Sequence, residues 1–250
     1  GEQDLLRASY SGDHRYIVTT GRSQNRYDLT SISCIDRASL KATSVDVASV
    51  VTTSADFSGK SSFLYIDGGR SVLSRSLPGL ELIAGPLDLD GYALDFHSLR
   101  RVRGRDAWVL FQFDGACRAF SMSPLAWTWN SLPDGVAGED SHVSGTALDD
   151  STAVIVTESP MRIVRVDALT GSVRSDARIV GVAPAEGCVL FEGAVWVLDV
   201  AVTPAKLRGF DERGREVGPS LDIEVGRMVK VYSSESGQKA VVLSQSADRS

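Results

Sequence analysis

The sequence predicts an all-β protein assembled from a repeated unit of about 45 residues. Two observations predict this class. Most segments alternate apolar and polar residues with period two, and no window keeps the i, i+3, i+4, i+7 apolar spacing of an amphipathic helix. In addition, six dense apolar runs recur at intervals of 42–47 residues between their centres. Such regular recurrence indicates one supersecondary unit repeated along the chain.

The dense apolar runs mark the same strand in every unit. They comprise residues 16–18, 63–66, 108–111, 153–156, 195–198 and 240–243. Turns rich in Gly or Asp precede most of the runs, and such turns join neighbouring antiparallel strands. We therefore predict that each run is the second strand of its unit. The runs around Leu64, Val109, Ile155 and Val197 are expected to be the most buried part of each unit.

The second half of each unit recurs as a strand, a short turn and another strand. Asp36, Asp167 and Asp211 open three of these turns, where a carboxylate accepts hydrogen bonds from backbone N–H groups. Gly171 and Gly214 close two of them and supply the positive φ that such turns need. Each unit is therefore predicted to contain four strands.

A four-stranded sheet that is apolar on both faces is stable only when neighbouring sheets cover those faces, and radial repetition provides that cover. The predicted fold is therefore a β-propeller, with a sandwich or another β-solenoid as the alternative. One domain is predicted over residues 1–250, with an incomplete last unit. The units span about residues 5–46, 47–91, 92–139, 140–181, 182–226 and 227–250.

One turn carries a family resemblance. Residues 166–173, Val-Asp-Ala-Leu-Thr-Gly-Ser-Val, resemble the D-x-x-T-G-x-V turn of YVTN and PQQ-type propeller repeats, and residues 210–217 are a looser version. The resemblance implies four-stranded propeller blades. The Trp that often closes PQQ-type repeats is missing at the corresponding places, and the Gly-His…Trp-Asp pair of WD40 repeats is also missing. The resemblance is thus to the propeller superfamily, with YVTN/PQQ-like or WD40-like blades, and implies no cofactor.

Composition limits the partners. The net charge of −6 argues against general binding to nucleic acid or membranes, because phosphate contacts need a concentrated positive field. No apolar stretch reaches the length of a membrane span. Cys34, Cys117 and Cys188 are odd in number and form no C-x-x-C pair, so we expect three reduced core thiols. Reduced thiols favour an intracellular location.

No catalytic or metal-binding residue is predicted. The candidates are scattered singly and show no ligand or triad spacing: His14, His97, His142, Asp56, Asp95 and Asp149. First strands line the central channel of a propeller, so convergence of some of these groups at its mouth would indicate a hydrolase or lyase. A carbohydrate-binding propeller is a further alternative. Hairpin turns are also rich in Asp for conformational reasons alone.

Two groups of residues are candidate binding sites. Arg100, Arg101, Arg103 and Arg105 lie in one predicted hairpin loop of a net-acidic chain. Because Arg presents a bidentate fork to carboxylate and phosphate, this loop predicts docking of an acidic partner, the alternative being a solvated loop. Trp127 and Trp129 point to the same face of one strand. They either pack between blades or anchor a partner.

The sixth unit contains two strands and then the sequence stops. Either the chain continues in a longer protein, or a strand from another protein pairs with the edge at residues 240–243. The predicted function is therefore a non-catalytic protein-interaction scaffold, as a propeller domain of a larger protein or complex. Its expected partners are other proteins.

Overall fold

The computed structural model describes residues 5–11, 13–22, 29–48, 62–67, 71–89, 96–102, 105–112, 117–129, 142–158, 160–224, 228–233 and 240–245. Every regular element in these residues is a β-strand, and this confirms the predicted all-β class. No helix long and apolar enough to cross a bilayer occurs in them.

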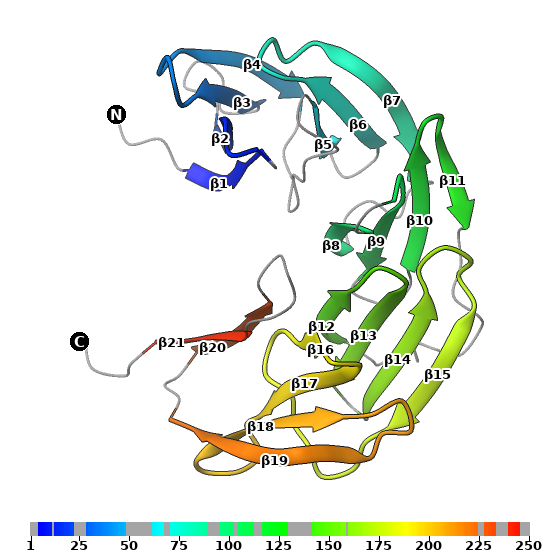
Figure 1. Cartoon of the computed structure of the whole chain (residues 1–250). Coiled ribbons are helices and arrows are strands. Elements are labelled where there is room, and N and C mark those ends of the chain that lie inside the picture. Colours follow the sequence, from blue (N-terminus) through cyan, green and yellow to red (C-terminus); the bar gives the residue numbers. More distant parts are fainter. Residues whose placement is uncertain are drawn as a thin grey trace. The chain divides into compact units, whose positions relative to one another are not determined.

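Antiparallel strands form six sheets that follow one another along the chain (Figure 1). The first three sheets contain β1 (Leu5–Tyr10), β2 (Tyr16–Arg22), β3 (Leu29–Asp36) and β4 (Ala42–Ala48), then β5 (Ser62–Asp67), β6 (Ser71–Ser76) and β7 (Leu82–Asp88), then β8 (Phe96–Arg101), β9 (Trp108–Gln112), β10 (Cys117–Met122) and β11 (Leu125–Trp129).

The last three sheets contain β12 (Val143–Leu148), β13 (Thr152–Glu158), β14 (Met161–Asp167) and β15 (Val173–Arg178), then β16 (Val189–Phe191), β17 (Ala194–Asp199), β18 (Ala205–Phe210) and β19 (Glu216–Ile223), then β20 (Met228–Ser233) and β21 (Ala240–Gln245). Each described sheet pairs strands that are consecutive in sequence. Four sheets show four strands within the described ranges, the second shows three and the last shows two.

The predicted second strands β9, β13 and β17 lie inside their four-stranded sheets, whereas β5 lies at the edge of the three strands described for its sheet. Phe63–Ile66 on β5, Trp108–Phe111 on β9 and Ala153–Val156 on β13 are buried, as are Val195, Val197 and Leu198 on β17. This burial confirms the prediction that these runs are the most buried parts of their units. Each fully buried large apolar side chain contributes roughly 1.5–3 kcal/mol relative to an exposed one.

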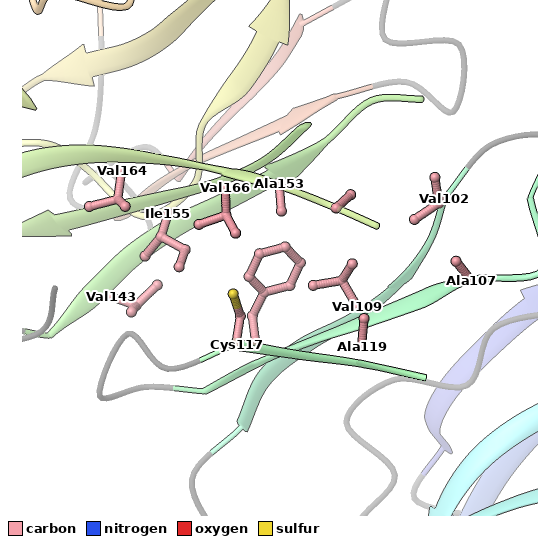
Figure 2. Packing of buried hydrophobic residues seen from close by; sticks show 12 residues of the cluster. Val102, Ala107, Val109, Cys117, Ala119, Val143, Ala153, Ile155, Val164 and Val166 are labelled. Atoms are coloured by element: carbon pink, nitrogen blue, oxygen red, sulfur yellow. The ribbon is translucent and has the colours of Figure 1, made fainter. Parts of the chain in front are cut away.

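The strand β13 shows why these runs are continuously apolar. Ala153 and Ile155 enter one core, whereas Val154 and Val156 enter another. Figure 2 shows the first core, in which Val109 and Cys117 face Ile155 and Val166. Because the side chains of a strand alternate between the two faces of the sheet, a sheet covered on both faces needs apolar residues at successive positions.

The chain divides into two compact units, namely residues 1–101 with 120–126, and residues 102–119 with 127–250. In the first unit, Val18, Ile32 and Cys34 pack with Phe63 and Tyr65. The second unit contains the two cores that share β13 and a further core that includes Val231 of β20.

In the second unit, the segment just before β16 bonds through backbone atoms to the first strands β12 and β20. The Gly187 N–H donates to the Ser144 carbonyl of β12 over 2.7 Å, and the Val231 N–H of β20 donates to the Glu186 carbonyl over 2.9 Å. A Cβ at Gly145 would lie 2.7 Å from the Gly187 carbonyl carbon. Glycine is therefore required at this close approach.

The turns between third and fourth strands repeat one geometry. Asp36, Asp167 and Asp211 each accept hydrogen bonds from two backbone N–H groups of their own turn, at distances of 2.8–3.0 Å. This confirms the predicted role of the three carboxylates. This role follows from the local sequence, because each Asp accepts hydrogen bonds from N–H groups two to four residues further along the chain.

Candidate functional site

The predicted arginine loop connects β8 to β9. Arg101 and Arg105 are exposed, Arg100 is half-buried, and Arg103 lies outside the described residues. The loop is held by its backbone, because Val102 N–H donates to the Ala107 carbonyl over 2.8 Å and Arg105 N–H donates to the Val102 carbonyl over 3.2 Å. Val102 itself is fully buried. The loop therefore presents exposed arginines beside a buried anchor residue.

The two tryptophans have different surroundings. The Trp127 ring lies beside the Arg118 guanidinium, with 5.7 Å between the guanidinium carbon and the ring centroid. The Trp129 indole N–H donates to the Ala168 carbonyl over 3.1 Å, and its ring lies so close to Gly171 that a Cβ there would approach it within 2.9 Å. Trp129 thus packs β11 against the turn after β14, which is one of the two roles that the sequence left open.

The described His and Asp candidates do not come together in a cluster that would support the hydrolase or lyase alternative. His14 and His142 are exposed, while Asp56, Asp95 and the side chain of His97 lie outside the description. Asp149 caps its own turn by accepting from the N–H groups of Ser151 and Thr152. Within the described ranges, no three His, Cys, Asp or Glu side chains converge as metal ligands.

The three cysteines are unpaired and buried in separate places. Burial raises the pKa of Cys34 to about 11, with a smaller contribution from the Asp36 charge. Burial also raises the pKa of Cys117. Because the thiolate is the nucleophilic form, a raised pKa makes these thiols unreactive at neutral pH.

Two buried charged side chains, Arg165 and Asp199, form hydrogen bonds with groups of the protein itself. Arg165 on β14 is 3% exposed and donates to the carbonyls of Gly193 and Phe210, over 2.8 Å and 3.1 Å. Burial lowers its pKa. Asp199 is fully buried and accepts from the N–H groups of Ala183 and Ala201 and from Arg208. Both groups therefore join segments of the second unit.

Two neighbouring turns of the first sheet form a surface that sequence reasoning missed. We call this surface the first turn face and define it as Tyr10, His14, Arg15, Arg37, Leu40 and Lys41, all exposed. One Arg37 nitrogen donates to the His14 carbonyl over 2.8 Å, and the guanidinium carbon lies 5.7 Å from the Tyr10 ring centroid. The Tyr10 and His14 rings are 6.0 Å apart. These contacts join the turn after β1 to the turn after β3.

The carboxylates of Asp36 and Asp13, beside the first turn face, accept hydrogen bonds from residues of the same two turns. Asp36 accepts from the N–H groups of Ser39 and Ala38, and its other oxygen lies 3.3 Å from Arg15. The Ser39 hydrogen bond is the main cause that lowers the pKa of Asp36. Asp13 accepts from the Ser11 hydroxyl and the Arg15 N–H. Lys41 forms no ion pair in the described part of the chain.

The chain is similar in structure to the C-terminal WD40 domain of Sif2, with a TM-score of 0.65 and 11% sequence identity. The match covers 95% of this chain, which spans 63% of the length of that structure. In all, 887 chains of solved structures match, so the likeness shows a common fold and no single function. No family model and no curated protein matches the sequence. The fold is thus a WD40-like β-propeller fold, as the sequence repeat predicted, although the Trp-Asp signature of WD40 repeats is missing.

Proposed function

We propose that this protein is a non-catalytic interaction scaffold whose arginine loop docks an acidic segment of another protein. The observation that carries the proposal is the exposure of Arg101 and Arg105 on a hydrogen-bonded hairpin of a net-acidic chain. The Arg105 guanidinium has no partner in the described residues, so its donors are available to a carboxylate. The backbone hydrogen bonds of the turn reduce the backbone entropy that the loop loses when it binds a partner.

Replacement of Arg100, Arg101, Arg103 and Arg105 by Ser tests this proposal. We expect the variant to weaken binding of fluorescent polyglutamate and to flatten the salt dependence of that binding, because charge pairs at an interface rim are screened by salt. Fluorescence anisotropy at several salt concentrations measures both effects. Circular dichroism checks that the variant remains folded.

The matched control replaces Arg178 and Arg213 by Ser. Both are exposed arginines in the second unit, and neither forms a side-chain ion pair in the described ranges. The control should bind polyglutamate as the wild-type protein does. Equal polyglutamate binding by the four-fold Ser variant and the wild-type protein at low salt would remove the proposal.

The proposed architecture is a single propeller of five four-stranded blades and a sixth blade that is completed at β21 by a strand of a longer chain or of a partner. Support comes from the pairing of β21 with β20 along one edge, with no other strand beside it among the described residues. Amide hydrogen exchange at Val241–Leu243 tests this architecture. Protection of these amides in a monomer of residues 1–250 would contradict it.

A further inference from the structure

The first turn face combines two strained backbone positions. His14 and Leu40 have φ values of 57° and 55°, in the left-handed region that L residues with a Cβ rarely occupy. A left-handed conformation brings Cβ close to the following carbonyl oxygen, so it is unfavourable unless the side chain makes compensating interactions. The two residues belong to turns that Arg37 connects through its hydrogen bond to the His14 carbonyl. Two of the four non-glycine residues with positive φ in the described chain thus lie at this exposed surface, the others being Leu80 and Glu192.

Comparison among the repeats shows that Leu40 is unusual. The equivalent turn position is Gly171 in the fourth sheet and Gly214 in the fifth, both with positive φ, so glycine satisfies the geometry there. The second sheet has Leu80 at this position with φ of 61°, but that side chain is 2% exposed and packs in the core of the first unit. Leu40 is 80% exposed. Its side chain therefore adds strain and gains no burial within the protein.

The exposed charged side chains nearest Leu40 in its own turn are cationic, whereas the exposed Asp13 of the neighbouring turn accepts hydrogen bonds from Ser11 and Arg15. Arg37 and Lys41 flank Leu40 in the chain and are exposed, and neither has a carboxylate partner in the described part. The neighbouring Asp36 carboxylate faces backbone amides and Arg15. Tyr10, 54% exposed under the Arg37 guanidinium, adds aromatic surface. The surface therefore offers an apolar contact bordered by cations.

We propose that the first turn face is a second docking surface, which binds an acidic peptide segment carrying a large apolar side chain. The apolar side chain packs on Leu40 and Tyr10, while carboxylates pair with Arg37 and Lys41. This proposal rests on the proposed function as a protein-interaction scaffold and adds a surface separate in sequence from the arginine loop. Strained residues cluster at functional sites, and a binding role would account for an exposed Leu at position 40 where the fourth and fifth sheets have Gly.

The test uses a short fluorescent peptide of Glu, Asp and Leu and the variant Leu40→Gly. We expect the melting temperature of Leu40→Gly to be unchanged or a few degrees higher, because the strain is relieved. Its affinity for the peptide should fall about tenfold, the effect of losing a partly buried Leu contact. A purely structural role for Leu40 would instead lower the melting temperature and leave affinity unchanged. That result would overturn the proposal.

The matched control is Leu169→Ser, which changes a 41% exposed leucine in the equivalent turn of the fourth sheet. It should bind the peptide as the wild-type protein does. A peptide with Ser in place of Leu should bind the wild-type protein as weakly as the original peptide binds Leu40→Gly. Stronger binding of single-stranded oligothymidylate than of the peptide would overturn the proposal in favour of a nucleic-acid surface.

The arginine-loop variant separates this proposal from the proposed function. If the four Ser substitutions abolish peptide binding while Leu40→Gly retains full affinity, the arginine loop is the docking site and the first turn face is not. If Leu40→Gly and Arg37→Gln lose affinity while the loop variant retains it, the first turn face binds the peptide. A wild-type protein that does not bind the peptide also overturns the inference, whereas polyglutamate binding tests the arginine loop separately.

Discussion

At the scale of single residues, glycines in the second unit mark places where other atoms occupy the space of a Cβ. At Gly209 a Cβ would lie 2.8 Å from the Trp196 ring, and at Gly145 it would meet the backbone of Gly187. Gly187 also has a φ of +97°. Because backbone atoms cannot move away as a flexible side chain can, Gly187 is the least replaceable of these positions.

We predict that Gly187→Ala lowers the free energy of unfolding by about 3 kcal/mol, from backbone strain and collision with the Val231 carbonyl. Gly181→Ala is the matched control, since Gly181 has a φ of +76° with no atom within 4 Å of an added Cβ. Strain alone should cost about 1 kcal/mol there. Urea unfolding followed by circular dichroism measures both values. Equal losses would show that β20 does not approach Gly187 closely.

At the scale of elements, an Asp carboxylate stabilises the turn between the third and fourth strands in three of the sheets, through Asp36, Asp167 and Asp211. The Asp167 carboxylate accepts from two N–H groups of its turn, and its other oxygen lies 2.6 Å from Arg174. The Arg174 hydrogen bond is the main cause that lowers the pKa of Asp167 to about 2. Ionised Asp167 is therefore favoured in the folded protein.

This lowered pKa predicts a pH-dependent contribution to stability. The contribution is present above the ordinary Asp value near pH 4 and is lost as the pH falls through about 2, because protonation removes the acceptor charge. Asp167→Asn should therefore unfold at a lower urea concentration than wild type at pH 6, and the difference should fade as the pH approaches 2. Urea midpoints across this range measure the effect.

Asp150→Asn is the control for this pH series. Asp150 is exposed in the turn between β12 and β13 and makes no side-chain hydrogen bond in the described ranges. Its substitution should leave the urea midpoint nearly unchanged at every pH. If the urea midpoint of Asp167→Asn lies as far below that of the wild-type protein at pH 2 as at pH 6, the Asp167 side chain acts through packing and not through its charge.

At the scale of the whole molecule, several separate apolar cores stabilise the protein, and each core lies between consecutive sheets. Cys34 lies in the core of the first unit, whereas Cys117 and Cys188 lie in two cores of the second unit. Those two cores both use β13 and β14, through residues on opposite faces such as Val164 and Ile163. Loss of the β12–β15 sheet would therefore expose both cores together.

We predict that Cys117 and Cys188 become reactive toward iodoacetamide at the same denaturant concentration, because the shared sheet couples their cores. Peptide mass spectrometry after pulse labelling measures each thiol separately, and Cys34 reports on the first unit in the same experiment. All three thiols should be protected in the native protein, since each is buried. Different midpoints for Cys117 and Cys188 would contradict the coupling.

The sequence by itself determined the all-β class, the dense buried runs on β5, β9, β13 and β17, and the Asp caps of three turns. These features are local: alternation is read within a strand, and an Asp finds its N–H partners two to four residues ahead. Only the tertiary structure decided that Trp129 packs on the turn after β14, or that Arg37 connects the two turns of the first turn face, because those contacts join residues 23 to 39 positions apart. The sequence shows Leu40 where the fourth and fifth repeats have Gly171 and Gly214, but the exposure of Leu40 depends on the chain around it. Contacts between turns and between sheets follow from strand register and packing, which no local pattern specifies.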